Sequence, residues 1–277
     1  MREATTAIYS RLHSTHHEAT VSRNLAYGPN SRHACNIFVP AGRAAAPRPM
    51  VVFVHGGGFT KGDKELADTP FYDNFGYWAA RHDFIGVTSS YRLAPEFKWP
   101  AGGDDVEALL KWLCVQADTY GADNRQIFLV GHSAGATHVA TCLSRLDDDL
   151  RKHVAGAILN SGIYDVASAA GSSIGGVLAG YFGPDVSAYP EMSSVPALSG
   201  LGIPLMVTVN EREPHEFQRQ GLEAVREIFQ AGSPLPHFVT LWGHNHYSSL
   251  LHVGLAQGDM LGEHMQCFVS SVRHGRS

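Results

Sequence analysis

The chain has 277 residues, with 26 Asp and Glu against 21 Lys and Arg, so its net charge is −5 when histidine is neutral. This acidic balance argues against nucleic acid as the main partner, because phosphate binding requires a basic face. With 44% hydrophobic and 17% charged residues, the composition is typical of a globular chain and excludes a disordered one. No apolar run reaches the about 18 residues of a membrane span. No secretory signal is visible at the start, so we expect a cytoplasmic protein.

The first 24 residues are polar and compatible with a helix, and residues 41–49 have the composition of a surface loop. After this loop, short apolar runs rich in Val, Ile and Phe alternate with longer amphipathic segments. Continuous apolar runs of this length suit strands that are buried on both faces of a parallel sheet. The strands are predicted at residues 50–54, 84–88, 127–130, 154–159, 204–209 and 237–242.

The segments between these runs include residues 104–117 and 215–230, whose apolar residues recur at helical spacing. Strands that alternate with helices across short connections predict a parallel, doubly wound α/β sheet. Residues 165–203 are rich in Gly, Ser, Ala and Pro and break this rhythm. We therefore expect residues 1–277 to form a single domain, with residues 1–24 and about 165–203 as cap or lid segments.

A G-x-S-x-G pentapeptide, Gly-His-Ser-Ala-Gly, directly follows the predicted strand at residues 127–130. A helix-compatible segment at residues 134–146 comes next. In this context the pentapeptide predicts a sharp turn that exposes a strained serine, so Ser133 is the candidate nucleophile. Gly131 and Gly135 allow the strand and helix backbones to approach closely. The start of the helix also favours developing negative charge beside the serine.

Three consecutive glycines, residues 56–58, follow the first predicted strand and precede Phe59. Acyl transfer creates an oxyanion, which needs backbone N–H donors at close range, and a side chain would hinder that approach. We therefore expect the amides of Gly57, Gly58 and Ala134 to form an oxyanion hole.

Several motifs recur in one order and at characteristic spacing: His55 to Phe59, Ser90 to Glu96, Trp99 to Ala101, Asp104-Asp105 and Gly131 to Gly135. In this combination the chain resembles the hormone-sensitive-lipase-like carboxylesterase branch of the α/β-hydrolase superfamily over about residues 35–270. The later segments Ser161 to Asp165 and Gly243 to His246 are also similar to arylformamidase-like and small esterase relatives. The resemblance implies an α/β-hydrolase fold, with a mostly parallel eight-stranded sheet flanked by helices and a small cap, and a Ser–acid–His hydrolase.

The same resemblance implies that an acid and then a histidine follow the serine along the chain. Related esterases place their acid just before a proline in an E-x-D-P segment. Aligned in this way, Glu213 takes the acid position in place of the usual aspartate, and Glu211 is the alternative. In the loop after the last predicted strand, the family pattern favours His246 as the base, with His244 as its rival.

The chain contains 16 histidines, which raises the question of a metal site. His13, His16, His17 and Glu18 lie close together near the start, but they do not form an H-E-x-x-H motif. The pair around Asn245 lacks a carboxylate or cysteine in the right pattern. We therefore expect no metal and no cofactor.

The aromatic residues Phe59, Tyr181 and Phe182 are the candidates for lining a substrate pocket. The leading hypothesis is a serine carboxylesterase that cleaves small or aromatic esters through an acyl-enzyme. An arylformamidase-like amide hydrolase is the alternative, and a non-catalytic ligand receptor on the same fold is a remote one. The expected partner is a small-molecule ester or amide, with no nucleic acid and no membrane, and a homodimer is compatible with the sequence.

Overall fold

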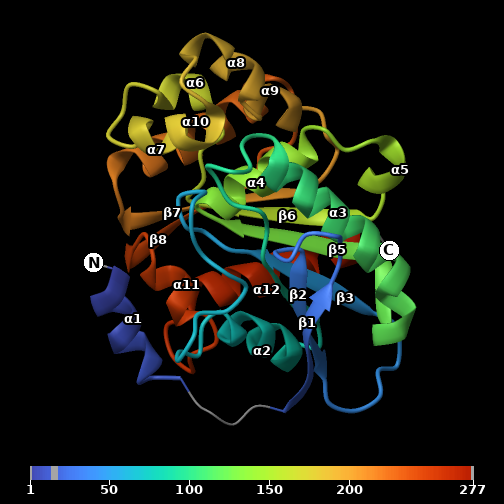
Figure 1. Cartoon of the computed structure of the whole chain (residues 1–277). Coiled ribbons are helices and arrows are strands. Elements are labelled where there is room, and N and C mark those ends of the chain that lie inside the picture. The colour runs from blue at the N-terminus through green and yellow to red at the C-terminus, as the bar shows by residue number, and fades with distance from the viewer. Residues whose placement is uncertain (1, 14–17, 276–277) are drawn as a thin grey trace.

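The computed structural model describes residues 2–13 and 18–275, in which one eight-stranded sheet runs between two layers of helices (Figure 1). The spatial order of the strands is β1-β2-β4-β3-β5-β6-β7-β8. The pairs β1–β2 and β2–β4 are antiparallel, and all the other pairs are parallel. This mixed, mostly parallel sheet confirms the predicted α/β fold. The strands are β1 (Ala19–Ala26), β2 (Ala34–Pro40), β3 (Arg48–Val54), β4 (Ile85–Ser89), β5 (Ala122–His132), β6 (Val154–Asn160), β7 (Leu205–Arg212) and β8 (His237–Asn245).

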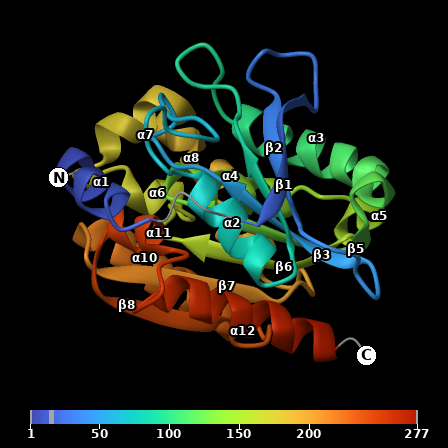
Figure 2. The ribbon, with the colours of Figure 1, turned by 90° about the horizontal axis from the view of Figure 1, so that it is seen from below.

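Helices cover both faces of the sheet (Figure 2). On one face α2, α11 and α12 pack against an apolar cluster rich in aromatic residues, and on the other α3, α4 and α10 pack against a mainly aliphatic cluster. Every residue of β3 and β6 is buried because helices cover these central strands on both sides. The α-helices are α1 (Arg2–Ser10), α2 (Asp73–Arg81), α3 (Ala101–Gln116), α4 (Ala134–Leu143), α5 (Asp148–Arg151), α6 (Val166–Ala169), α7 (Gly175–Phe182), α8 (Tyr189–Met192), α9 (Val195–Leu198), α10 (His215–Gln230), α11 (Ser248–His252) and α12 (Met260–Gly275), with 3-10 turns η1 (Ala117–Tyr120) and η2 (Val186–Ala188).

The six strands predicted from apolar runs are all present, but β1 and β2 were not predicted. The prediction that residues 1–24 are helix-compatible is wrong beyond the first turns, because α1 ends at Ser10 and β1 begins at Ala19. β1 is an edge strand with no fully buried residue. A strand exposed in this way carries few apolar residues, so it lacks the pattern that identifies a buried strand.

The helices α6 to α9 gather at one end of the molecule, above the sheet in Figure 1. The apolar side chains of α6, α7 and α8 form a third cluster together with Phe59, in the loop after β3, and Ala134, the first residue of α4. This segment lies within the predicted insertion at residues 165–203. The apolar side chains of this segment therefore lie close to the carboxyl ends of the central strands.

Candidate active site

The parallel arrangement of β3, β5, β6, β7 and β8 brings their carboxyl ends to the same edge of the sheet. The loops that begin there carry the glycine run after β3, Ser133 after β5, Ser161 after β6, Glu213 after β7 and His246 after β8. Residues far apart in the sequence therefore meet at one place, which is where α/β sheets bind their ligands.

Ser133 lies in the turn between β5 and α4 with φ 54° and ψ −121°, a conformation that non-glycine residues rarely adopt. The turn is tight because a Cβ on Gly131 would collide with the backbone of Gly135 and Ala136, and one on Gly135 with the carbonyl of Val54. The Ser133 amide donates to the Asn160 carbonyl at 2.8 Å and so ties the turn to β6. This is the strained geometry that the pentapeptide predicts.

His246 joins Ser133 to Glu213. Its Nε2 lies 2.9 Å from Ser133 Oγ, and its Nδ1 lies 2.8 Å from Glu213 Oε2. An ionised carboxylate only accepts hydrogen bonds, so Nδ1 carries the proton and Nε2 is free to accept from the serine hydroxyl. The ring is buried and packs against Phe217 at 4.2 Å between centroids. The backbone carbonyl of His246 lies 2.7 Å from His132 Nε2. These contacts hold the imidazole in one orientation.

The Glu213 carboxylate is fully buried and held by several donors. Its Oε1 accepts from the Asn210 amide at 2.7 Å and from Ser161 Oγ at 3.0 Å, and its Oε2 also accepts from Asn210 Nδ2 at 3.3 Å. A buried charge is tolerated only when hydrogen bonds replace its water, and this set does so. Sequence reasoning did not assign Asn210 or Ser161 a role. The only feature of the sequence that could have identified them is their position, since each lies at the carboxyl end of a predicted parallel strand.

The alternative acid, Glu211, and the alternative base, His244, have other partners. Glu211 Oε2 accepts from the Gly243 amide at 2.6 Å and so links the carboxyl-terminal ends of β7 and β8. His244 Nδ1 lies 3.1 Å from Ser248 Oγ, and its ring is 5.3 Å from the ring of His252. Burial, aided by the neighbouring His252, lowers the pKa of His244 to about 4, so this imidazole is neutral at pH 7. Glu211 and His244 are thus engaged with Gly243 and Ser248 and not with Ser133.

The glycine run curls tightly beside Ser133. Gly57 has φ 145° and Gly58 has φ 59°, and a Cβ on Gly57 would collide with the Lys61 carbonyl. Within residues 2–13 and 18–275 the Gly57 and Gly58 amides donate to no protein acceptor. The amide of Ala134 begins α4, where the first N–H groups of a helix have no partner within it. These donors are available to an oxygen bound beside the serine.

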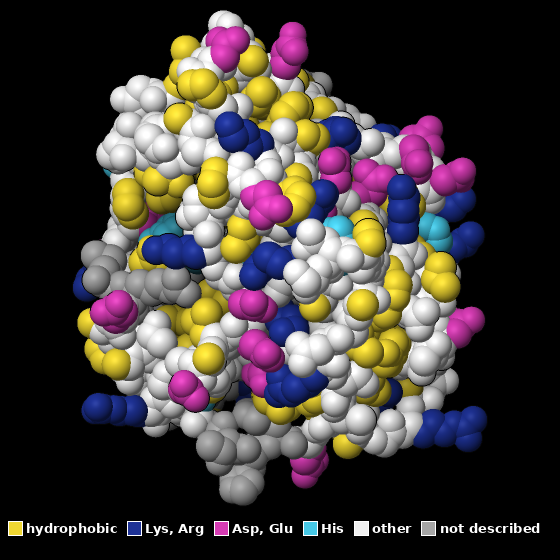
Figure 3. Space-filling view, in the orientation of Figure 1, with side chains coloured by type: hydrophobic (Ala, Val, Ile, Leu, Met, Phe, Trp, Pro, Cys, Tyr) yellow, Lys and Arg dark blue, Asp and Glu magenta, His cyan; other side chains and the backbone are white. Residues whose placement is uncertain are grey.

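A pocket of about 630 Å³ opens at Ser133, and we call it the serine pocket. Its floor holds Ser133, His246 and the glycines, and its walls are mainly apolar. On the face seen in Figure 3, a histidine lies in a hollow with a lysine or arginine beside it. The pocket is lined by residues 56–59, Lys61, Tyr72, residues 132–134, Thr137, Ile163, Ile174, Val177, Leu178, residues 212–214, Phe217, His246 and Tyr247.

Of the three aromatic candidates, Phe59 lines the serine pocket, whereas Tyr181 and Phe182 do not. Tyr181 stacks behind Phe59 at 4.5 Å with nearly parallel rings, and Phe182 meets Phe59 edge-on at 5.7 Å. The Tyr181 hydroxyl accepts from the Gly102 amide, so this ring is anchored to α3. Both aromatics support the wall. Phe217, which sequence reasoning read only as part of the apolar face of a helix, lines the pocket instead.

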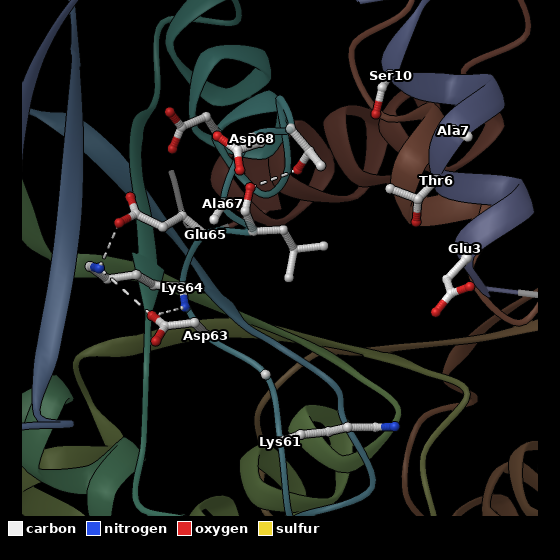
Figure 4. A pocket seen from close by; sticks show the side chains of 14 residues that line it. Glu3, Thr6, Ala7, Ser10, Lys61, Asp63, Lys64, Glu65, Ala67 and Asp68 are labelled. Carbon is white, nitrogen blue, oxygen red and sulfur yellow. Dashed lines mark hydrogen bonds and ion pairs between the residues drawn. The ribbon is translucent and has the colours of Figure 1, made fainter.

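A second and larger pocket of about 1380 Å³ lies next to the first, between α1 and the loop before α2 (Figure 4). We call it the acidic pocket because five carboxylates and two lysines line it. It shares Lys61 with the serine pocket. No histidine from residues 2–13 and 18–275 lines it, so this part of the chain supplies no imidazole to activate its hydroxyl groups. Its residues are Glu3, Thr6, Ala7, Ser10, residues 61–69 and Asp73.

Within residues 2–13 and 18–275, no three His, Cys, Asp or Glu side chains cluster as a metal site would require. His13 Nε2 lies 2.8 Å from the Leu251 carbonyl, whereas His16 and His17 fall outside the described residues. Over the same part of the chain, no helix has the length and apolar character needed to cross a membrane.

Comparison with known proteins identifies the family of the chain. The BD-FAE family model matches residues 35–183, more than half of the chain. The chain is 37% identical over 103 residues to esterase LipI of Mycobacterium tuberculosis, which is 37% of this chain and 31% of that protein. It is 32% identical over 116 residues to arylacetamide deacetylase of Bos taurus, which is 41% of this chain and 28% of that protein. The chain thus spans about a third of the length of these relatives.

Solved structures show the same fold. Esterase B from Lactobacillus rhamnosis superposes with a TM-score of 0.81 at 17% identity, over 99% of this chain and 92% of that one. The esterase from Pyrobaculum calidifontis superposes with a TM-score of 0.76 at 22% identity, over 98% of this chain and 89% of that one. Taken together with the family model and the sequence relatives, these matches confirm the resemblance to hormone-sensitive-lipase-like carboxylesterases, but not the arylformamidase-like features. The family match and the shared sheet show that the chain belongs to the BD-FAE family of α/β-hydrolases.

Proposed function

We propose that this protein is a serine carboxylesterase in which Ser133 is the nucleophile, His246 the general base and Glu213 the acid. One observation carries the proposal: a continuous chain of hydrogen bonds runs from Glu213 through His246 to Ser133, with both links within 2.9 Å. A hydroxyl becomes a good nucleophile only when an adjacent base takes its proton and a third group orients that base.

The reaction follows from these positions. His246 Nε2 takes the proton of Ser133 as Oγ attacks the ester carbonyl, and the Glu213 carboxylate balances the imidazolium charge. The amides of Gly57, Gly58 and Ala134 hold the oxyanion of the tetrahedral intermediate. His246 then returns the proton to the departing alcohol, which leaves an acyl-enzyme on Ser133. A water molecule, activated by the same imidazole, releases the acid.

The substrate we propose is a small or aromatic ester. A pocket of about 630 Å³ accommodates a ligand of that size, and the walls contributed by Phe59, Ile163 and Phe217 are apolar. Related structures are consistent with this class: esterase B was crystallised inhibited by a tributyrin phosphonate, and another structural match is a bacterial heroin esterase.

The decisive test combines covalent labelling with a variant. A fluorophosphonate is expected to label the wild-type chain once, at Ser133, and Ser133→Ala is expected to lose labelling and at least about 10³-fold in kcat on p-nitrophenyl acetate. Far-UV circular dichroism checks that the variant is folded. Full activity in folded Ser133→Ala would refute the proposal, and absence of labelling in the wild type would favour a receptor. Faster cleavage of N-formylkynurenine than of esters would favour the amide hydrolase.

A further inference from the structure

The charges on the serine pocket are unevenly distributed. Three of its lining residues carry formal charge: Lys61, Arg212 and Glu213. The Glu213 carboxylate is turned inward, where His246, Asn210 and Ser161 bind it. The charge left at the opening is therefore that of two cations, in a protein whose net charge is −5.

Lys61 is held close to the expected oxyanion donors. Its amide donates to the Gly57 carbonyl at 3.3 Å, and its own carbonyl lies where a Gly57 side chain would be. Its ammonium group makes no ion pair with the carboxylates of residues 2–13 and 18–275. In Figure 4 the side chain extends away from Asp63 and Glu65. The ammonium charge is thus uncompensated at the boundary between the two pockets.

Arg212 is the last residue of β7 and directly precedes Glu213. Its side chain is 71% exposed, and its Nε is 3.6 Å from Glu211 Oε2, an oxygen already engaged by the Gly243 amide. A partner at that distance, shared with another donor, offsets the guanidinium charge only weakly. The planar guanidinium fork is suited to binding a carboxylate through two parallel hydrogen bonds.

We propose that Lys61 and Arg212 select esters that carry a carboxylate in addition to the scissile ester bond. The inference rests on the proposed esterase function and specifies its substrate class. The apolar walls hold the hydrocarbon part, while the two cations attract and orient the carboxylate at the opening. The neighbouring acidic pocket offers the same group no excess of positive charge, because its five carboxylates outnumber the two lysines that line it and Lys64 is already paired with Asp63 and Glu65. An anionic ester is therefore directed toward Ser133 and away from the larger pocket.

The test compares matched esters in the full-length protein. One set places the charge on the leaving group: 4-acetoxybenzoate is anionic, 4-acetoxybenzamide is neutral, and 4-acetoxyphenyltrimethylammonium is cationic. A second set places it on the acyl chain: mono-p-nitrophenyl adipate against p-nitrophenyl hexanoate. The variants are Lys61→Met, Arg212→Gln and their double, with Arg125→Gln as the control. Arg125 is exposed near the start of β5, at the opposite end of the sheet from Ser133, so the control removes one charge away from the pocket.

The measured quantity is the ratio of kcat/KM for the anionic ester to kcat/KM for the neutral ester. General damage to the enzyme cancels within this ratio, and the intrinsic reactivity of the two esters cancels when the ratio of a variant is compared with that of the wild type. In at least one set, each single variant is expected to lower this ratio about threefold at low salt and the double variant about tenfold, with Arg125→Gln near the wild type. Added salt at about 0.5 M is expected to weaken the preference, because the charges are exposed. Unchanged ratios in both sets, with neutral esters still cleaved, would overturn this inference alone. No cleavage of any ester by the wild type would overturn the proposed function instead.

Discussion

The serine pocket and the acidic pocket share Lys61, yet they differ in almost every other respect. The acidic pocket has about twice the volume, roughly 1380 Å³ against 630 Å³, and many more charged groups. Those groups mostly neutralise one another or nearby cations: Lys64 pairs with Asp63 and Glu65, and Arg23 pairs with Glu65 and Asp73. The smaller pocket places a strained serine against an oriented imidazole. We therefore expect reactivity at the serine pocket, because it depends on how a few groups are arranged and not on the volume or the charge of a cavity.

The strongest test of this difference between the pockets is to remove the carboxylate that orients the imidazole of His246. Glu213→Ala is expected to lower kcat by about 10³- to 10⁴-fold, because the tautomer and the charge balance of His246 are lost. Glu211→Ala is expected to cost less than about tenfold, since Glu211 contacts the Gly243 amide and not the imidazole. Steady-state kinetics on p-nitrophenyl acetate measures both.

Because the Glu213 carboxylate is buried among donors, Glu213→Gln serves as a second variant that keeps its size. Circular dichroism establishes that each protein is folded. If Glu211→Ala were the more damaging substitution, the acid would have to be reassigned to Glu211.

A smaller effect concerns the free energy of unfolding. The wall of the serine pocket is backed by a fully buried histidine, His138. His138 contacts Phe59 edge-on at 5.4 Å and lies 3.4 Å from the Tyr181 hydroxyl. Burial, with a lesser contribution from His55, lowers its pKa to about 3. Between pH 6.5 and 3 the unfolded chain binds a proton that the folded chain does not. The free energy of unfolding therefore falls as the pH falls through this window.

His138→Gln removes this titration and keeps a polar group near Tyr181. Urea unfolding at pH 7 and pH 4.5 is expected to show that the wild type loses about 2–3 kcal/mol more than the variant between the two pH values. Equal losses in the two proteins would mean that His138 is protonated in the folded state.

The smallest expected effect on activity comes from substitutions in the acidic pocket. The double variant Glu3→Gln, Asp68→Asn is expected to change kcat/KM for p-nitrophenyl acetate less than about twofold, because both side chains are exposed and remote from the reacting atoms. A loss greater than about tenfold, in a protein with native circular dichroism, would make the two pockets one functional site.

The parts of the site that follow from local chemistry could be predicted from the sequence. The turn around Ser133 depends on a strand, two glycines and a helix start within a few residues, and a short segment contains all of these. The glycine run after β3 is equally local. The choice between Glu211 and Glu213, or between His244 and His246, is different, because each pair is only two residues apart. In each pair the first residue lies at the end of a strand and the second just beyond it, so which side chain faces Ser133 depends on where the strand ends and how the chain leaves the sheet.

The sequence by itself therefore determined the fold class, six of the eight strands and the segments that meet at the edge of the sheet, although β8 is a partly exposed edge strand and not buried on both faces as expected. These features are encoded by apolar periodicity and by glycines at positions that no other residue can occupy. Only the tertiary structure decided which carboxylate contacts His246, that Tyr181 and Phe182 lie behind the pocket wall, and that Lys61 and the weakly paired Arg212 both line the serine pocket. These features depend on side-chain directions and on contacts between residues far apart in the chain, which a linear pattern does not contain.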